Sequence, residues 1–469
     1  MRVSHRWLVW LAVLGIGLVA WLPAGAGEPE KAAEPAKAPE PAKEAEPAKA
    51  PEPPKAGEPA KLKGEDNQLC IECHLKTTPS IVAQWSASGH AKAKEPVPCL
   101  KCHGAKEGDP GAYVHRDALI VEVVSPRICG QCHAEQVKQF SASRHAEAAN
   151  VTGSLEQFAG DYLEGQAASI LGCQSCHGSK VVIGADHKPD AKTWPNTGVG
   201  RINPDGTKGA CSACHARHSF ARAQARRPEN CGRCHLGPDH PQLEVYKESK
   251  HGVLFDAHVA EMNLDRPKWV VGVDYSAAPT CATCHMSATT KQATTHDVGQ
   301  RLSWTLRPVI SIKQQDWQRK RVNMREVCIH CHSGDNVEKF FKQFDAAVRL
   351  YNTKFAKPAK TIMDQLYKEK LLTRTPFDER IEWDYYLLWH NQGRRARHGA
   401  AMMGADYVHW HGFFDVAETF YTAFLPAAEK LKKGITQKAL EKDDHAWLKG
   451  MTKEQLDLID KFYKDRYEE

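Results

Sequence analysis

The residues most able to do chemistry in this chain are its cysteines, because all 16 lie in one repeated unit. Each unit has two cysteines separated by two residues and followed directly by a histidine. The eight units are Cys70, Cys73 and His74; Cys99, Cys102 and His103; Cys129, Cys132 and His133; Cys173, Cys176 and His177; Cys211, Cys214 and His215; Cys231, Cys234 and His235; Cys281, Cys284 and His285; and Cys328, Cys331 and His332. No cysteine is left over.

This unit is the attachment signature of c-type haem, in which two thiols form thioethers with the vinyl groups and the histidine binds the iron. Structural zinc would need two cysteine pairs, or a pair with distant ligands, and would not require a histidine after every pair. Disulfides would not impose the two-residue spacing eight times. The sequence therefore predicts eight c-type haems.

The remaining histidines predict how the irons are capped. The chain has 24 histidines, and eight serve as ligands within the motifs. A haem for electron transfer needs a second axial ligand, whereas a haem that binds substrate needs an open position. Seven histidines lie beside small residues or near a motif, so we expect seven bis-histidine haems and one five-coordinate haem. These candidates are His90, His115, His145, His218, His251, His296 and His398, although His411 and His445 share the same local sequence texture.

Residues 1–26 have the pattern of a secretory signal peptide, with Arg2 and Arg6 before an apolar run and then small residues. The alternative is an uncleaved segment that tethers the protein to a membrane, although the run is short for a span. Haem attachment to such motifs is completed outside the cytoplasm, so we expect a periplasmic or other extracytoplasmic protein. Residues 27–63 are rich in Pro, Ala, Glu and Lys, which predicts a solvated, disordered linker.

The globular part divides at the last motif. Residues 64–332 carry all eight motifs, so the porphyrins themselves would supply much of the apolar interior of this octahaem domain. The formal charge of +6 falls once two propionates per haem are added, so a surface for nucleic acid is not indicated.

Residues 333–469 have instead the sequence pattern of helices. Apolar side chains from Val337 to Phe355 recur at three- and four-residue spacing, which indicates an amphipathic helix. Further helices are expected over 378–398, 413–432 and 452–466. The predicted fold class is mainly α: a multihaem cytochrome c with a haem-packed core and long C-terminal helices.

Two sequence blocks resemble one known family. The blocks CSACHARHSF…ARRPENCGRCHLGPDHPQLEVYKESKHG (residues 211–252) and GADYVHWHG, with the order of the eight motifs, are similar to the octahaem hydroxylamine oxidoreductases, which include hydrazine dehydrogenases. The resemblance covers about residues 64–430. It implies that the fourth haem, on Cys173, Cys176 and His177, is catalytic and has an open distal face.

The same resemblance assigns roles to three further residues. Asp239 and His240 match an aspartate–histidine pair that lines the open face, where a near-neutral imidazole held by a carboxylate would accept protons. The plainer alternative is that Asp239 only fixes a turn before Pro241. Tyr407 matches the tyrosine that oxidative members bond covalently to the catalytic haem of a neighbouring subunit in a homotrimer.

Other interpretations of Tyr407 stay open. It could simply pack among Trp410, Phe413 and Phe414, and Tyr385 or Tyr386 could take its role. The family function implied is oxidation of hydroxylamine or hydrazine, with electrons passed to a cytochrome c or a membrane quinone-linked acceptor. An octahaem reductase of nitrite or hydroxylamine, and a non-catalytic electron conduit, are the two alternatives.

Overall fold

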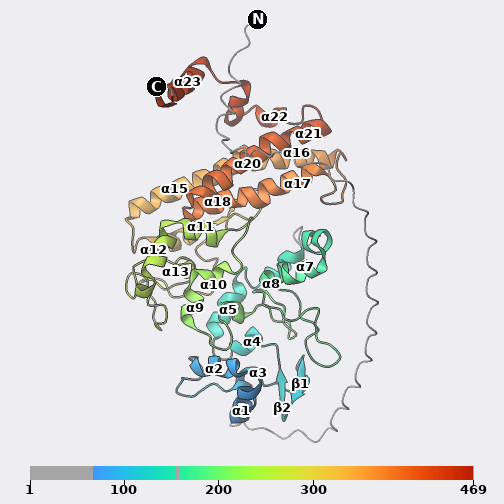
Figure 1. Cartoon of the computed structure of the whole chain (residues 1–469), viewed down its shortest axis with the longest axis vertical. Helices are drawn as coiled ribbons and strands as arrows, with labels where there is room; N and C mark the ends of the chain where they lie inside the picture. Colours follow the sequence, from blue (N-terminus) through green and yellow to red (C-terminus); the bar gives the residue numbers. More distant parts are fainter. Residues whose placement is uncertain (1–66, 154–157, 468–469) are drawn as a thin grey trace, which may run out of the picture. The chain divides into compact units, whose positions relative to one another are not determined.

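The computed structural model describes residues 67–153 and 158–467, all of which belong to one compact unit (Figure 1). The predicted signal peptide, the whole of the predicted linker and the boundary at residue 64 lie outside the described residues. Among the described residues, no helix is both long and apolar enough to span a bilayer.

The motif-bearing part consists of short helices joined by long connections. Most motifs form one helical turn, which places the two cysteines three residues apart on one face. The elements as far as residue 177 are α1 (Asn67–Thr77), α2 (Pro79–Ala87), α3 (Cys99–His103), α4 (Pro126–Cys129), α5 (Ala134–Ala142), η3 (Ala148–Gly153), the π-helix η4 (Ala159–Gly165), α7 (Gln166–Leu171) and α8 (Cys173–His177). The antiparallel hairpin of β1 (Ala112–His115) and β2 (Ala118–Val121), with Tyr113 opposite Ile120, was not predicted from the sequence.

The chain from the fifth to the eighth motif continues in the same style. Its elements are η5 (Cys211–Ala213), α9 (Arg222–Arg226), α10 (Pro228–Gly232), α11 (Gln242–Glu248), α12 (Lys250–His258), η6 (Val259–Met262), α13 (Cys281–His285), β3 (Trp304–Thr305), β4 (Ile312–Lys313) and α14 (Trp317–Cys328). The two short strands pair antiparallel, and α14 ends at the first cysteine of the last motif.

The C-terminal part forms three long helical runs. The first joins α15 (Gly334–Leu350), η7 (Tyr351–Ala356) and α16 (Lys357–Lys368), and the second joins α17 (Arg380–Tyr386), η8 (Leu387–Gln392) and α18 (Gly393–Met402). The third joins α19 (Ala405–Val408), η9 (His409–Phe414), α20 (Asp415–Glu418), η10 (Thr419–Phe424) and α21 (Leu425–Leu431). Next come α22 (Gln437–Leu440), η11 (Asp443–Lys449) and α23 (Lys453–Tyr467).

Segments η7, η8, η9 and η10 are π-helical. Segments η7 and η10 end shortly before a proline, at Pro358 and Pro426, where the missing backbone N–H removes one regular helical hydrogen bond.

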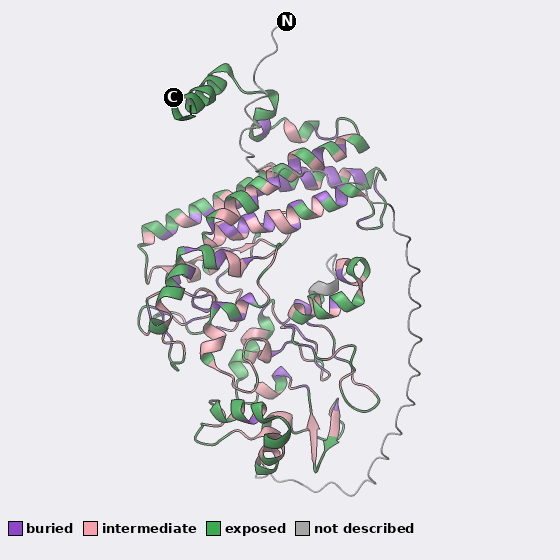
Figure 2. Cartoon of the chain, viewed as in Figure 1, coloured by how far each residue is buried: buried purple, intermediate pink, exposed green. Residues whose placement is uncertain are grey.

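The largest apolar cluster lies within these helical runs, at buried positions between Tyr351 and Ile435 (Figure 2). It includes Phe355, Phe420 and Phe424, whose side chains are almost or completely enclosed. Most motif cysteines, by contrast, are only half-buried. The protein core and the motif-bearing region therefore differ as the sequence predicted, and the mainly α fold class is confirmed.

Candidate haem sites and active site

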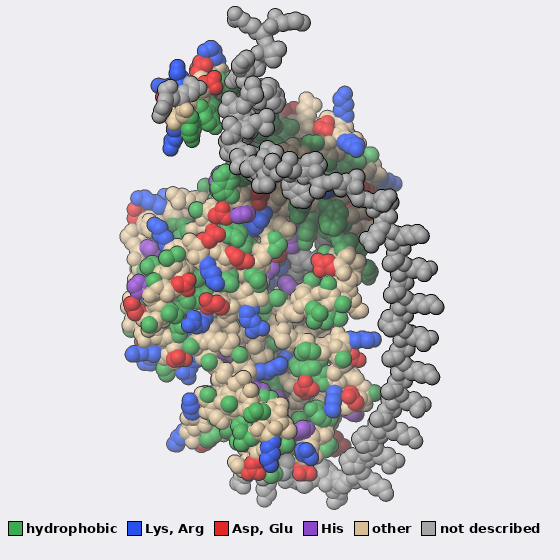
Figure 3. All heavy atoms as spheres, viewed as in Figure 1, with side chains coloured by type: hydrophobic (Ala, Val, Ile, Leu, Met, Phe, Trp, Pro, Cys, Tyr) green, Lys and Arg blue, Asp and Glu red, His purple; other side chains and the backbone are tan. Residues whose placement is uncertain are grey.

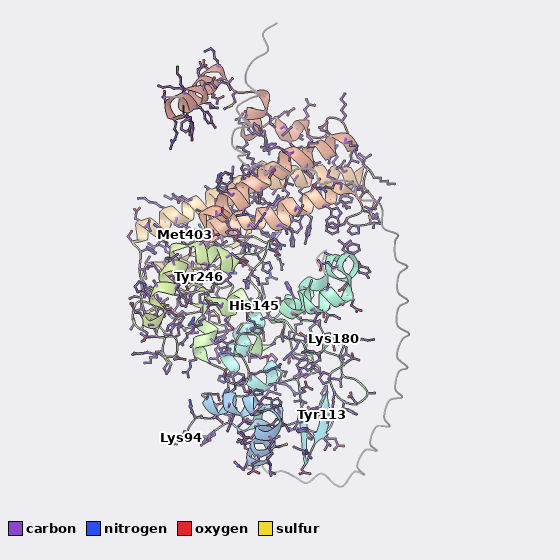
Figure 4. All side chains as sticks on the ribbon, viewed as in Figure 1. Lys94, Tyr113, His145, Lys180, Tyr246 and Met403 are labelled. Atoms are coloured by element: carbon purple, nitrogen blue, oxygen red, sulfur yellow. The ribbon has the colours of Figure 1, made fainter. Side chains whose placement is uncertain are left out.

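Six motif histidines face a second histidine across a gap of nearly constant size. The ring centroids lie 6.0–6.5 Å apart in all six pairs. The pairs, each with its motif histidine first, are His74–His115, His103–His218, His133–His90, His215–His296, His235–His145 and His332–His251. His145 of the fifth pair is labelled in Figure 4.

The size of this gap fits a haem iron. Two metal–imidazole bonds of about 2.0 Å, plus the distance from each nitrogen to its ring centre, add up to about 6 Å between centroids. A direct imidazole–imidazole hydrogen bond would draw the rings closer, and stacked rings in contact would do the same. Six of the seven predicted distal histidines thus lie where an axial ligand would be needed.

The seventh predicted ligand, His398, lies in a different environment. Its Nε2 is 3.3 Å from Nε2 of Gln242, and Oε1 of that glutamine is 3.3 Å from Nδ1 of His235. Burial lowers the pKa of His398 to about 3. Of the described histidines, none faces His177 or His285 at the spacing of the six pairs. The role of His398 as a distal ligand therefore stays a prediction.

Thiols of different motifs adjoin in a defined order. Burial, followed by the neighbouring Cys70, raises the pKa of Cys99 to about 11. The same kind of mutual influence links motifs 1–2–3–5–6–7–8 in series, and Cys176 of motif 4 joins the series at Cys234 of motif 6. The interacting thiols are Cys70–Cys99, Cys102–Cys129, Cys129–Cys211, Cys214–Cys231, Cys231–Cys281, Cys284–Cys328 and Cys176–Cys234. Haems attached at these positions would lie side by side, as electron transfer requires.

The second cysteines of motifs 3 and 8 lie nearer the surface than a haem-packed interior would suggest. Cys132 and Cys331 are exposed, whereas Cys73 of motif 1 is half-buried like most of the others. The backbone carbonyl of Cys73 accepts a hydrogen bond from Oγ1 of Thr77 at 3.2 Å, and Cys132 acts electrostatically on Cys102 of motif 2. Haem attachment at Cys132 and Cys331 therefore stays a prediction from the motif, without support from burial.

Backbone contacts fix the fourth motif in place. The N–H groups of Val199 and Gly200 donate to the carbonyls of Cys176 and His177 at 2.9 and 3.1 Å. Gly178 has a φ of +84°, and a side chain on Gly198 would come within 2.0 Å of its nitrogen. Only glycines allow the two segments to approach this closely.

Asp239 and His240 lie beside this fourth motif. The Sγ atom of Cys176 is 3.8 Å from the carbonyl of Arg233, and His240 acts electrostatically on the same thiol. The turn that carries the pair begins at Gly237, whose φ is +91° and whose N–H donates to Glu244. The two predicted acid–base residues therefore lie where the fourth and sixth motifs adjoin, with the ring of His240 6.1 Å from that of His235 between centroids.

Three hydrogen bonds hold the Asp239–His240 pair. Nδ1 of His240 is bonded to Oδ1 of Asp239, and Nε2 lies 2.7 Å from the carbonyl oxygen of Cys234. The other carboxylate oxygen of Asp239 is 3.2 Å from Nη1 of Arg394, whose side chain is 6% exposed. Arg394 also donates to the carbonyl of Arg307 at 3.1 Å.

The surroundings of Asp239 and His240 favour the charged form of both side chains. Burial raises the pKa of Asp239, but the bond to His240 and the cations nearby outweigh it and lower that pKa to about 2. Burial lowers the pKa of His240, and the bond to Asp239 outweighs it, so its pKa is raised above the ordinary value. Both ring nitrogens face acceptors, which the doubly protonated imidazolium satisfies. Sequence reasoning expected a near-neutral ring here instead.

Two residues of this group were missed from the sequence. Arg394 pairs with Asp239, and His390 also lowers the pKa of that carboxyl. Both belong to the second helical run of the C-terminal part, and both are buried. One feature of the sequence could have indicated them: two charged or titratable residues stand four positions apart inside an otherwise amphipathic helix.

Tyr407 lies in a separate group of polar residues. Its ring centroid is 5.7 Å from that of His411, which pairs with Asp406. Burial, followed by Glu244 and Glu248, raises the pKa of Tyr407. The predicted bond of Tyr407 to the catalytic haem of a neighbouring subunit stays a prediction from the resemblance.

The competing tyrosines lie elsewhere. Tyr385 packs near Phe424 with ring centroids 6.0 Å apart, inside the helical core. Tyr386 stacks on His390, with ring centroids 4.3 Å apart, and so supports a residue that acts on Asp239.

On the face of the molecule in Figure 3, histidines are spread along its length, and charges of both signs alternate without forming a basic patch.

The haem-attachment motifs adjoin one another in series, and six pairs of imidazole rings are spaced to hold an iron between them. These features define a multihaem c-type cytochrome. The chain belongs to the family described as seven times multi-haem cytochrome CxxCH, which matches residues 94–378. That range contains motifs two to eight, seven in all, and the first motif precedes it.

A known relative agrees with this assignment. A probable nitrite reductase-hydroxylamine oxidoreductase fusion protein of Kuenenia stuttgartiensis is 32% identical over 245 residues, which is 46% of this chain. The aligned region spans only 25% of that relative's length.

Two solved structures share the fold. A hypothetical multiheme protein superposes with a TM-score of 0.69 at 25% identity, covering 79% of this chain and 96% of the other. The reducing HAO-like protein complex of Kuenenia stuttgartiensis superposes with a TM-score of 0.60 at 21% identity, covering 81% of this chain and 90% of the other.

Proposed function

We propose that this protein is an octahaem oxidoreductase that oxidises hydroxylamine or hydrazine at the haem of Cys173, Cys176 and His177. The observation that carries the proposal is the Asp239–His240–Arg394 group beside Cys176 of the fourth motif, whose histidine, His177, no described imidazole faces at the spacing of the six pairs. Electrons would pass from motif 4 to motif 6, and then along the series of adjoining motifs to a cytochrome c or quinone-linked acceptor.

A c-type haem with an open axial position supplies a binding place for a small nitrogen compound and exchanges electrons with it. The polypeptide supplies the protons. His240 is held by Asp239 so that its ring cannot turn, and Arg394 keeps the carboxylate in place from the opposite side. A titratable group fixed in this way can take up or deliver a proton at one defined point.

The oxidative direction depends on Tyr407, through the resemblance to family members that form a tyrosine–haem bond. In this proposal the tyrosine reaches the catalytic haem of a neighbouring subunit in a homotrimer outside the cytoplasm. Mass spectrometry of the denatured mature protein tests it, because a cross-linked subunit pair would stay covalently joined. Tyr407→Phe should retain eight haems and lose both the bridge and most oxidative activity.

A second candidate function, reduction of nitrite or hydroxylamine, has its own supporting observation. Both nitrogens of His240 face acceptors, so the resting ring is arranged as a proton donor, and these reductions consume protons. The Kuenenia stuttgartiensis relative is named as a fusion of nitrite reductase and hydroxylamine oxidoreductase, which is compatible with either direction. Steady-state assays in both directions on the same preparation separate the two candidates.

Carbon monoxide binding tests whether the protein is an enzyme at all. The reduced protein should bind one molecule for each set of eight haems, and His240→Ala should retain that binding while losing turnover. A matched control is His258→Ala, which removes a half-exposed histidine paired only with Glu261. If carbon monoxide finds no vacant iron, the protein is an electron conduit and the enzymatic proposal fails.

A further inference from the structure

Arg301 is one of the most deeply buried charged residues in the described chain, at 2% exposed. Its guanidinium reaches back to the seventh motif. Nη1 donates to the carbonyls of Thr283 and Cys284 at 3.2 and 3.1 Å, and Nη2 donates to the carbonyl of Ser287 at 2.7 Å. The side chain therefore closes the C-terminal end of α13, the helix that ends at His285.

The positive charge of Arg301 has no partner carboxylate within ion-pair distance among the described residues. Its Nε is buried without a hydrogen-bond acceptor in the polypeptide. The carboxylate within electrostatic range is Glu326, and one of its oxygens is already occupied by Thr289 and Gln292, each at 2.6 Å. The guanidinium itself acts on both Cys284 and His285.

A second arginine of equal burial has the same kind of surroundings. Arg201 is also 2% exposed and adjoins Cys129 and Cys211 of motifs 3 and 5, and the carboxylate within its electrostatic range, Asp205, already pairs with Arg127. The polar contacts of Arg301, three carbonyl groups, solvate its charge but do not neutralise it.

We propose that Arg301 is a positioning residue that raises the reduction potential of the haem attached at Cys281, Cys284 and His285. An oxidised haem carries one more positive charge than the reduced haem, so a fixed cation beside it favours the reduced form. In a buried site the interaction is only weakly screened. The seventh haem then holds electrons more strongly than it otherwise would, at the point in the series between motifs 6 and 8. The inference rests on the proposed function only in taking this motif to carry haem.

The test is a spectroelectrochemical titration of the full holoprotein with Arg301→Gln, Arg301→Lys and the matched surface control Arg319→Gln. Arg319 is 61% exposed in its side chain and pairs with Asp316 on the surface. In Arg301→Gln one of the eight midpoints should fall, so that the oxidised-to-reduced ratio at the wild-type midpoint rises about tenfold, equivalent to about 59 mV. Arg301→Lys, which keeps the charge, should titrate like the wild type, and so should the control.

Haem content, measured by mass spectrometry, distinguishes a failure of the proposed haem complement from a failure of the role proposed for Arg301. Absence of haem from the seventh motif of the wild-type protein would contradict the proposed haem complement itself. A haem-replete Arg301→Gln protein whose titration superimposes on the wild type would overturn the role of Arg301, and so would an equal shift in Arg301→Lys. If Arg301→Gln loses haem, Arg301→Met fills the same volume without charge and must give the same downward shift.

Discussion

The contact between Arg394 and Asp239 gives the sharpest quantitative prediction. The two charges lie 3.2 Å apart, with side chains 6% and 20% exposed. At an effective dielectric constant of about 20, this distance gives a gross attraction of about 5 kcal/mol. Desolvation of both groups offsets much of it, so the coupling expected in a double-mutant cycle is about 1–3 kcal/mol.

The cycle uses Arg394→Gln, Asp239→Asn and the double variant, with kcat/KM as the measured quantity. Each single variant removes one partner of this buried ion pair, so the two single losses should add up to more than the loss in the double variant. The coupling corresponds to a factor of about 5 to 150 in kcat/KM. The matched control is the exposed pair Arg325–Glu338, at 2.8 Å with side chains 37% and 52% exposed, where the coupling should stay below about 1 kcal/mol. Additive effects at the buried pair would refute the reasoning.

Three further predictions concern the core, the Tyr407 segment and the pH dependence. Phe420→Ala, at a fully enclosed position, should cost about 3–5 kcal/mol of stability in thermal denaturation, whereas Phe462→Ala, 51% exposed, should cost almost nothing. Gly399→Ala should displace the tyrosine, because the new methyl group would lie 2.7 Å from the Tyr407 carbonyl carbon, and a loss of the cross-link in mass spectra would report it. Because the pKa of His240 is raised above 6.5, the charged pair stabilises the protein fully below pH 6.5 and is lost as pH rises through the folded-state pKa. Reductive turnover, if present, should fall across that same range, and oxidative turnover should rise.

The haem motifs could be predicted from the sequence because their chemistry is local. Two thiols and an imidazole within five residues define an attachment site whatever the surrounding fold is. The helix beginning near Val337 was also readable, since its apolar face packs on other protein segments and so keeps the helical period. The hairpin of β1 and β2 was not predicted, because its ten residues lie among motifs and turn at Arg116, which has a φ of +56°.

The depth of each motif in the fold was not readable in the same way. Cys132 and Cys331 are exposed, whereas the cysteines of motif 7 lie among buried residues, although all three motifs share the same spacing. The burial of a motif depends on which distant segments of the chain cover it. The five residues of the motif itself contain no information about those segments. An exposed thiol can still form its thioether, because attachment needs only the porphyrin edge within reach.

The partners across each haem could not be predicted residue by residue. His218 faces His103, a motif histidine more than one hundred positions earlier, and His90 faces the third motif rather than the nearer second one. The order in which motifs adjoin is likewise set by long-range packing: Cys176 of motif 4 adjoins Cys234 of motif 6. Counting histidines gave an expected number of capped irons, which stays a prediction, and it could not assign the pairs.

One helical run contributes residues to the candidate site that could not be assigned to it from the sequence. His390, Arg394 and His398 are spaced by four residues, so they share one face of the run formed by η8 and α18. That face reaches Asp239 through its first two residues and Gln242 through the third. Gln242 in turn contacts His235 of the sixth motif. The helical region that carries no haem motif therefore contacts both the proposed acid–base pair and, through Gln242, a motif histidine on the proposed electron path. Under the proposed function, a change in this helix would alter proton and electron transfer together.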